Sequence, residues 1–111
     1  MGADIFFHLE EKVGRRWQTV EPPEGGWHRF RSMEAINELH RIGLSTRPRG
    51  LSEAGGTFYD IAKGRKLHPE WSSLESVLGL RLPSWFGAYL LGPMVTAVPH
   101  NKARLLWYIT C

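Results

Sequence analysis

The chain has 111 residues, of which 42% are hydrophobic, 12% aromatic and 23% charged, and its formal net charge is +3. This length suits a single domain spanning residues 1–111, with enough apolar side chains to build a core. The composition excludes a disordered acidic tail, a collagen-like repeat and a disulfide-stapled miniprotein. The single cysteine, Cys111, also excludes an intramolecular disulfide.

The N-terminal segment predicts a β-hairpin. Residues 3–10 alternate between apolar and polar side chains, which is typical of a half-buried strand. Gly14 then allows a turn, and Arg16–Val20 can return beside the first strand. In that hairpin Trp17 and Thr19 share a face.

Two segments in the first half of the chain predict helical structure. Ser32 is suited to cap a helix that runs to about Ile42. Thr57–Lys63 predicts a helical turn, with Phe58 and Ile61 directed inward.

Further along, helices and loops alternate. Residues 44–56 are rich in Arg, Pro, Gly and Ser and predict an exposed loop. Ser72 and Glu75 form a capping box for a short helix that ends near Leu78. Residues 83–91 predict an apolar helix or strand that stops at the following Gly-Pro dipeptide.

The C-terminal residues 103–110 are dense in aromatic and branched side chains, which indicates a buried strand. The first strand is its natural partner. We therefore predict an α+β domain, a small antiparallel sheet of the N-terminal hairpin and the C-terminal strand, with two or three short helices over one face. A C-terminal strand at the sheet edge could instead pair across a two-fold axis, so the oligomeric state stays open.

The segments in this order resemble a family of small proteins from tailed bacteriophages and prophages. Members typically open Met-Gly-Cys-Asp-Ile-His, and this chain opens Met-Gly-Ala-Asp-Ile-Phe, with Ala3 and Phe6 in place of the Cys and His. The further matching segments are Gly14–Trp17, Arg31–Ile36, Pro48–Glu53, Trp71–Leu78 and Ala103–Ile109. The resemblance implies a phage origin and a related fold, and it brings no activity with it.

Basic residues in the middle of the chain are the candidate binding site. Arginine side chains bind phosphates or carboxylates in a bidentate manner, and a proline-stiffened loop loses less entropy on binding. Neighbouring aromatic side chains could stack on bases or anchor a protein interface. A solvated basic surface and aromatic residues within the core explain the same composition. The candidate binding residues are Arg47, Arg49, Lys63, Arg65, Lys66 and Trp27, the last following two glycines.

Catalytic chemistry has weak support in the sequence. The serines lie in no nucleophile motif, and no two histidines have the spacing of a zinc-binding helix. Asp4, His8 and Glu10 share one face of the first strand, where they could hold a divalent ion. A solvated polar face explains that pattern equally well. We therefore expect no catalytic residues, no cofactor and no metal, and we keep a metal-dependent hydrolase only as a third alternative.

Together these features predict a binding protein rather than an enzyme. We expect a small phage-encoded accessory protein that binds a host protein, for example as an inhibitor of a bacterial defence complex such as CRISPR–Cas (an anti-CRISPR). The alternative is a nucleic-acid-binding or nucleotide-binding protein that uses the basic loop. The longest apolar stretch is far shorter than the roughly 20 residues of a membrane span. We therefore expect no membrane association and a location in the cytoplasm of the bacterial host.

Overall fold

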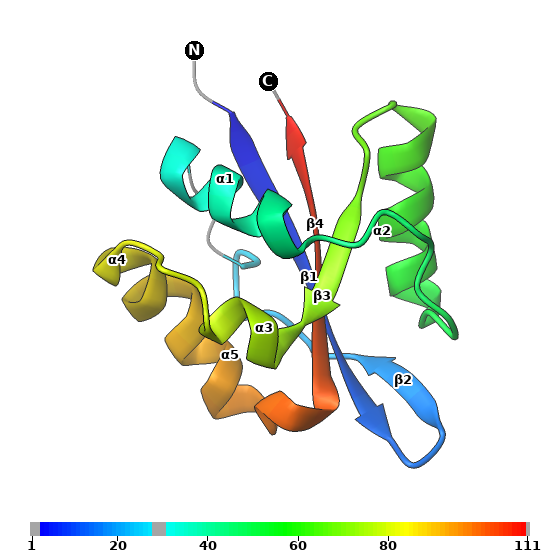
Figure 1. The fold of residues 1–111 in the computed structure, drawn as a ribbon. Helices are drawn as coiled ribbons and strands as arrows, with labels where there is room; N and C mark the ends of the chain where they lie inside the picture. The colour runs from blue at the N-terminus through cyan, green and yellow to red at the C-terminus, as the bar shows by residue number, and fades with distance from the viewer. Residues whose placement is uncertain (1–2, 28–30, 111) are drawn as a thin grey trace.

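The computed structural model describes residues 3–27 and 31–110, whose helices and strands follow one another as shown in Figure 1. They are β1 (Asp4–Val13), β2 (Arg16–Thr19), α1 (Met33–Ile42), α2 (Glu53–Gly64), β3 (Glu70–Ser73), α3 (Leu74–Leu78), α4 (Ser84–Phe86), a π-helical turn η1 (Gly87–Leu91), α5 (Gly92–Ala97), a 3-10 turn η2 (His100–Lys102) and β4 (Ala103–Thr110).

The strands form one antiparallel sheet in the order β2-β1-β4-β3. The predicted hairpin and the predicted pairing of the first and last strands are confirmed, and β1 and β4 pair from Asp4 opposite Thr110 to Glu11 opposite Ala103. The fold is therefore α+β, as expected. Because β1 and β3 both pair with β4 along Arg104–Trp107, this stretch is not an edge that could pair across a two-fold axis.

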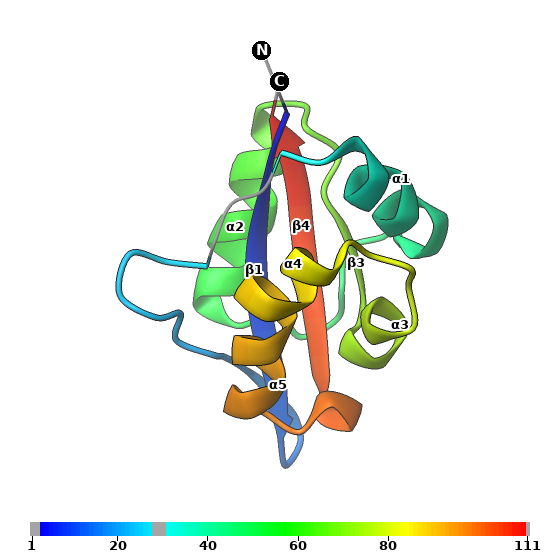
Figure 2. The same ribbon diagram turned by 90° about the vertical axis from the view of Figure 1, so that its left-hand side faces the viewer.

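One face of the sheet carries the main hydrophobic core. Ile5 and Leu9 of β1 and Leu105 and Trp107 of β4 are fully buried on this face. They pack with the helices α1, α3, α4 and α5, which cover this face of the sheet (Figure 2). Phe86 of α4 adds another buried ring to the core. Burying side chains of this size contributes roughly 1.5–3 kcal/mol each before entropy is subtracted.

Among the described helices, α2 is the one that lies on the opposite face of the sheet (Figure 1). The prediction that helices cover one face is therefore wrong, because α2 buries Tyr59 and Ala62 and the sheet beneath it buries Leu106. Phe58 adds a half-buried ring whose centroid lies 4.7 Å from that of Tyr108. The sheet is thus enclosed on both sides, and the second enclosure positions the candidate site.

Helix α2 also begins earlier and faces differently than predicted. It starts at Glu53, inside the predicted loop 44–56, because the hydroxyl of Ser52 accepts a hydrogen bond from the Gly55 N–H at 3.0 Å. Ile61, predicted to point inward, is 49% exposed. The side chains of α2 that point toward the sheet are instead Phe58, Tyr59 and Ala62.

The other helix caps largely agree with the sequence. Ser32 caps α1, and Gly43 follows the end of that helix, as expected. The cap of α3 is Ser73, which accepts from the Ser76 N–H at 3.2 Å, rather than Ser72. Ser72 is buried in β3, because the strand continues up to the start of the helix.

The apolar segment from residue 83 is helical and does not stop at the Gly-Pro dipeptide. Pro93 falls in the first turn of α5, which directly follows the π-helical turn. Because the helical path is continuous there, its missing N–H leaves one carbonyl of the preceding turn without a helical donor. The preceding π-helical turn ends with the Gly92 N–H donating to the Gly87 carbonyl. The helical path therefore continues to Ala97.

Across residues 3–27 and 31–110, no helix has the length and hydrophobicity that crossing a membrane requires.

Candidate binding surface

The polar side chains of β1 lie beneath α2 rather than in solvent. His8 and Glu10 alternate with the core residues of β1, and Glu10 pairs in register with Arg104 of β4. Glu10 is 0% exposed and Arg104 only 3% exposed. For His8 and Glu10 the alternative of a solvated polar strand face is therefore wrong, because α2 covers these two side chains.

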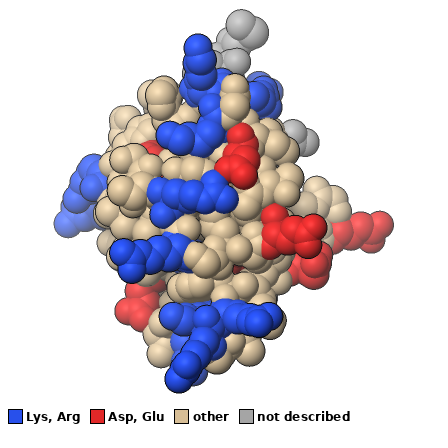
Figure 3. Space-filling model, turned by 90° about the vertical axis from the view of Figure 1, so that its right-hand side faces the viewer, with Lys and Arg blue, Asp and Glu red and all other residues tan. Residues whose placement is uncertain are grey.

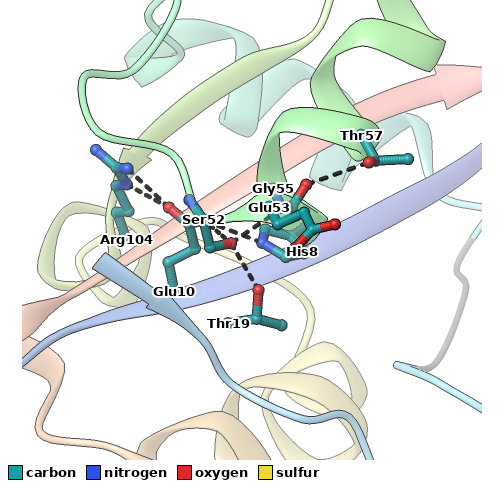
Figure 4. A network of polar contacts seen from close by, with 8 residues as sticks. All are labelled: His8, Glu10, Thr19, Ser52, Glu53, Gly55, Thr57 and Arg104. Carbon is teal, nitrogen blue, oxygen red and sulfur yellow. Dashed lines mark hydrogen bonds and ion pairs between the residues drawn. The ribbon is translucent and has the colours of Figure 1, made fainter. Parts of the chain in front are cut away.

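Both oxygens of the Glu10 carboxylate are occupied by hydrogen bonds (Figure 4). Arg104 donates to Oε1 through Nε at 2.9 Å and Nη2 at 2.7 Å. Oε2 accepts from the N–H of Ser52 at 2.9 Å and from its hydroxyl at 2.5 Å, and lies 3.3 Å from His8 Nε2. Thr19 Oγ1 lies 2.6 Å from the Ser52 hydroxyl oxygen and extends the cluster to β2.

These contacts hold the carboxylate ionised. Burial alone would raise the pKa of Glu10, but the hydrogen bonds from His8, Ser52 and Arg104 outweigh it and lower the pKa from 4.5 to about 2. The charge also lies at the N-terminus of α2, where the helix dipole favours an anion. The chain's own carboxylate thus anchors the helix to the sheet.

The close approach of α2 to this carboxylate depends on Gly55. A Cβ atom at this position would lie 2.2 Å from Glu10 Oε2 and 3.0 Å from His8 Nε2. Both atoms belong to side chains fixed by the hydrogen bonds described above. In the sequence Gly55 indicates a loop, but in the structure a glycine is required at this position of α2, because any side chain would overlap these two groups.

The guanidinium group of Arg104 also contacts aromatic rings. It lies 3.9 Å from the ring centroid of Trp17 and 5.8 Å from that of Trp71. Trp71 is held in turn by a hydrogen bond from Nε1 to the Thr46 carbonyl at 2.8 Å. Cation–π contacts of this kind supplement the ion pair and connect β2, β4 and β3.

The cluster has the geometry of a structural anchor rather than of a catalytic site. The Ser52 hydroxyl donates to a carboxylate, and the imidazole of His8 contacts that same carboxylate instead of the hydroxyl. Asp4, the third residue of the hypothetical metal site, accepts from Arg31 Nε at 2.7 Å. Within residues 3–27 and 31–110, no group of three His, Cys, Asp or Glu side chains could hold a metal ion.

Most of the predicted binding residues flank α2. Lys63 is in its last turn, Arg65 caps its C-terminus and Lys66 follows, and all three side chains are exposed. Figure 3 views the molecule from the α2 side and shows Lys and Arg side chains from top to bottom of this face. Arg47 and Arg49 lie in the loop before α2 and are also exposed. We call these five residues, Arg47, Arg49, Lys63, Arg65 and Lys66, the basic surface.

Arg47 is held in place within the basic surface. Its Nη1 forms an ion pair with Asp60 of α2, and its guanidinium lies 5.2 Å from the ring centroid of Tyr59. Arg49 and Arg65 have no ion-pair partner within the described part of the chain. Their charges are therefore available to an external partner.

Trp27 lies apart from the basic surface. It is half-buried and packs against the main core, on the opposite side of the sheet from α2. It also lines a cavity of about 480 Å³ with Pro23, Tyr89 and Pro93. The structure therefore does not place Trp27 together with the five basic residues.

The sequence interpretation missed the anchor of Glu10, Ser52 and Arg104. The one feature of the sequence that could have indicated this anchor is Arg104, a charged residue inside the apolar C-terminal strand. It lies on the opposite face of that strand from Leu105 and Trp107.

No protein-family model, curated protein or solved structure matches the chain.

Proposed function

We propose that this protein acts by binding an acidic surface of another protein through the basic surface around α2. The observation that supports this function is the set of exposed cations on a helix that the anchor of Glu10 fixes to the sheet. A rigidly held helix loses little entropy on binding, so its charges are preorganised for a partner. Arginine is also enriched among the residues that dominate protein interfaces.

The resemblance to phage proteins suggests which kind of partner the basic surface binds. A phage accessory protein of this kind would bind a protein, or a protein–nucleic-acid complex, of the bacterial host. Inhibition of a defence complex such as CRISPR–Cas is the specific form that we propose. Its support is the resemblance together with the basic surface, which could bind an acidic face of a defence protein or the phosphate backbone of its nucleic acid.

Nucleic-acid binding is the second candidate function, and the same cations favour it. The aromatic rings near α2 argue for the protein partner instead. Phe58 packs against the rings of His8 and Tyr108, and Tyr59 is buried beneath Arg47. Rings held inside the fold offer no platform on which successive bases could stack.

Affinity capture in a bacterial host with active defence systems tests both functions. We expect a stoichiometric protein partner to stay bound in about 0.5 M salt, because a protein interface also buries apolar and hydrogen-bonded contacts that salt does not screen, whereas phosphate contacts weaken steeply. Nucleic acid that is released by this wash, with no protein retained, would support the second function instead.

A pair of charge-reversal variants then locates the binding surface. Arg49→Glu with Arg65→Glu removes two unpaired cations and should abolish capture of the partner. Arg15→Glu with Arg16→Glu makes the same charge change at exposed positions of the β-hairpin and should leave capture intact. Equal capture by both variants would contradict the proposed surface.

A further inference from the structure

A second candidate site lies where β3 separates from β4. The two strands pair only as far as Glu70 opposite Trp107. Pro69 cannot donate a backbone hydrogen bond to the ladder, and His68 has a φ of 52°, which turns the chain away from β4. The separation leaves a cavity of about 450 Å³ between α1, the end of α2 and β4. Small-molecule sites typically have volumes of roughly 300–1,000 Å³.

The wall of this cavity is largely apolar. Met33 and Ile36 of α1, Leu67 of the connection and Ile109 of β4 line it. Met33 is 65% exposed although it is a large hydrophobic residue. These side chains would contact an aliphatic group.

Of the charged and imidazole side chains that line the cavity, His40 and Glu70 contact each other, whereas Lys63 and His68 do not form an ion pair among the described residues. His40 and Glu70 contact each other, with Nδ1 2.5 Å from Oε1. The other Glu70 oxygen lies against Gly43, where an added Cβ would be 2.5 Å from it. Lys63 and His68 also line the cavity, and neither has an ion-pair partner among the described residues. The charge available to a ligand is therefore positive.

We propose that this cavity binds a medium-chain aliphatic carboxylate. The alkyl chain packs on Met33, Ile36 and Ile109, and the carboxylate accepts hydrogen bonds from Lys63 and His68. An apolar wall with a few convergent polar groups is the usual design of a small-molecule site. This site shares Lys63 with the basic surface, but it needs neither a protein partner nor the arginines of that surface.

Calorimetric titration with a series of straight-chain carboxylates tests the apolar wall. Affinity should rise about fourfold for each methylene from butanoate to octanoate, as expected for methylene burial. The absence of saturable octanoate binding would overturn the proposal.

The carboxylate contact is tested by changing the headgroup and the lysine separately. Octanol should bind at least about tenfold more weakly than octanoate, because it lacks the charged acceptor. Lys63→Gln should weaken octanoate by a similar factor and leave octanol unchanged. Lys102→Gln, the same substitution at an exposed lysine outside this cavity, is the matched control and should bind octanoate normally.

Amide chemical shifts identify where the carboxylate binds. Octanoate should shift the signals of Lys63, Leu67 and His68 in the wild-type protein. Equal binding of octanol and octanoate, or unchanged octanoate binding by Lys63→Gln, would overturn the assignment of the headgroup. Shifts confined to the remainder of the chain would overturn the location.

Discussion

The face of the sheet beneath α1, α3 and α5 is filled mainly by apolar side chains, whereas the face beneath α2 places a charged pair against aromatic rings. Apolar packing depends on volume and tolerates changes of shape that preserve it. The Glu10–Arg104 pair depends on both partners, because either charge left alone in the interior lacks compensation. The two faces should therefore respond differently to paired substitutions.

The largest expected effect is that of Arg104→Met. It leaves the buried carboxylate without its main partner and should lower the free energy of unfolding by about 3–5 kcal/mol. Urea denaturation measures the loss. Adding Glu10→Met should restore much of the stability, because no unpaired charge then remains.

Leu105→Ala, on the core face of the same strand, is the comparison for this pair. It should cost about 2–5 kcal/mol through the cavity it creates. Combining it with Glu10→Met should not restore stability. Failure of Glu10→Met to compensate for Arg104→Met would show that the α2 face is held by packing rather than by charge.

Acid should weaken the α2 face. Because the Glu10 pKa is lowered from 4.5 to about 2 in the folded protein, its contribution is fully present above pH 4.5 and is lost as the pH falls toward 2. The shift corresponds to roughly 3 kcal/mol. Denaturation measured between pH 7 and acid should show this decline, and Glu10→Gln should reduce it. An unchanged pH dependence in that variant would contradict the role of Glu10.

Two adjacent glycines of α2 provide a matched test of the close approach to the sheet. Gly55→Ala should cost about 1–3 kcal/mol, because its methyl group would overlap the fixed Glu10 carboxylate. Gly56→Ala meets only Arg47 Nη2 at 3.7 Å and should stabilise the helix by about 0.5–1 kcal/mol. Thermal unfolding distinguishes the two, and equal effects would contradict the close contact.

The smallest difference is expected between two helix caps. Ser32→Ala removes a cap from α1 and should cost about 1 kcal/mol. Ser52→Ala removes both the α2 cap and a hydrogen bond to Glu10, so its cost should be greater by about 1 kcal/mol. Parallel urea denaturation of the two variants checks this order.

The difference between the apolar face and the α2 face of the sheet also explains which parts of the fold could be predicted from the sequence. The alternation around Ile5, Phe7 and Leu9 indicates a strand with one apolar face, and the composition of 103–110 identifies its partner. The C-cap at Gly43 and the N-cap at Ser32 follow from local chemistry. The strand alternation and the caps depend on neighbouring residues, and the pairing of the two strands follows from the apolar composition of each, which is why the sequence alone indicates these features.

The α2 face could not be predicted in this way, because a polar strand face looks the same whether water or a helix covers it. His8 and Glu10 are buried only because Arg104 and Ser52 satisfy Glu10 from distant parts of the chain. Gly55 indicates a flexible loop until its contact with the carboxylate is known. The basic residues around α2 were identified from their composition, and their role in binding stays a prediction.

The position of β4 also determines when the sheet can form during synthesis. This strand lies between β1 and β3, and its Arg104 contacts a residue 94 positions earlier in the chain. A growing polypeptide therefore cannot assemble the middle of the sheet until β4 has left the ribosome. Such non-local contacts slow folding and raise the contact order. Until β4 is available, β1 has only the short β2 beside it in the sheet, and its apolar side chains are exposed to aggregation.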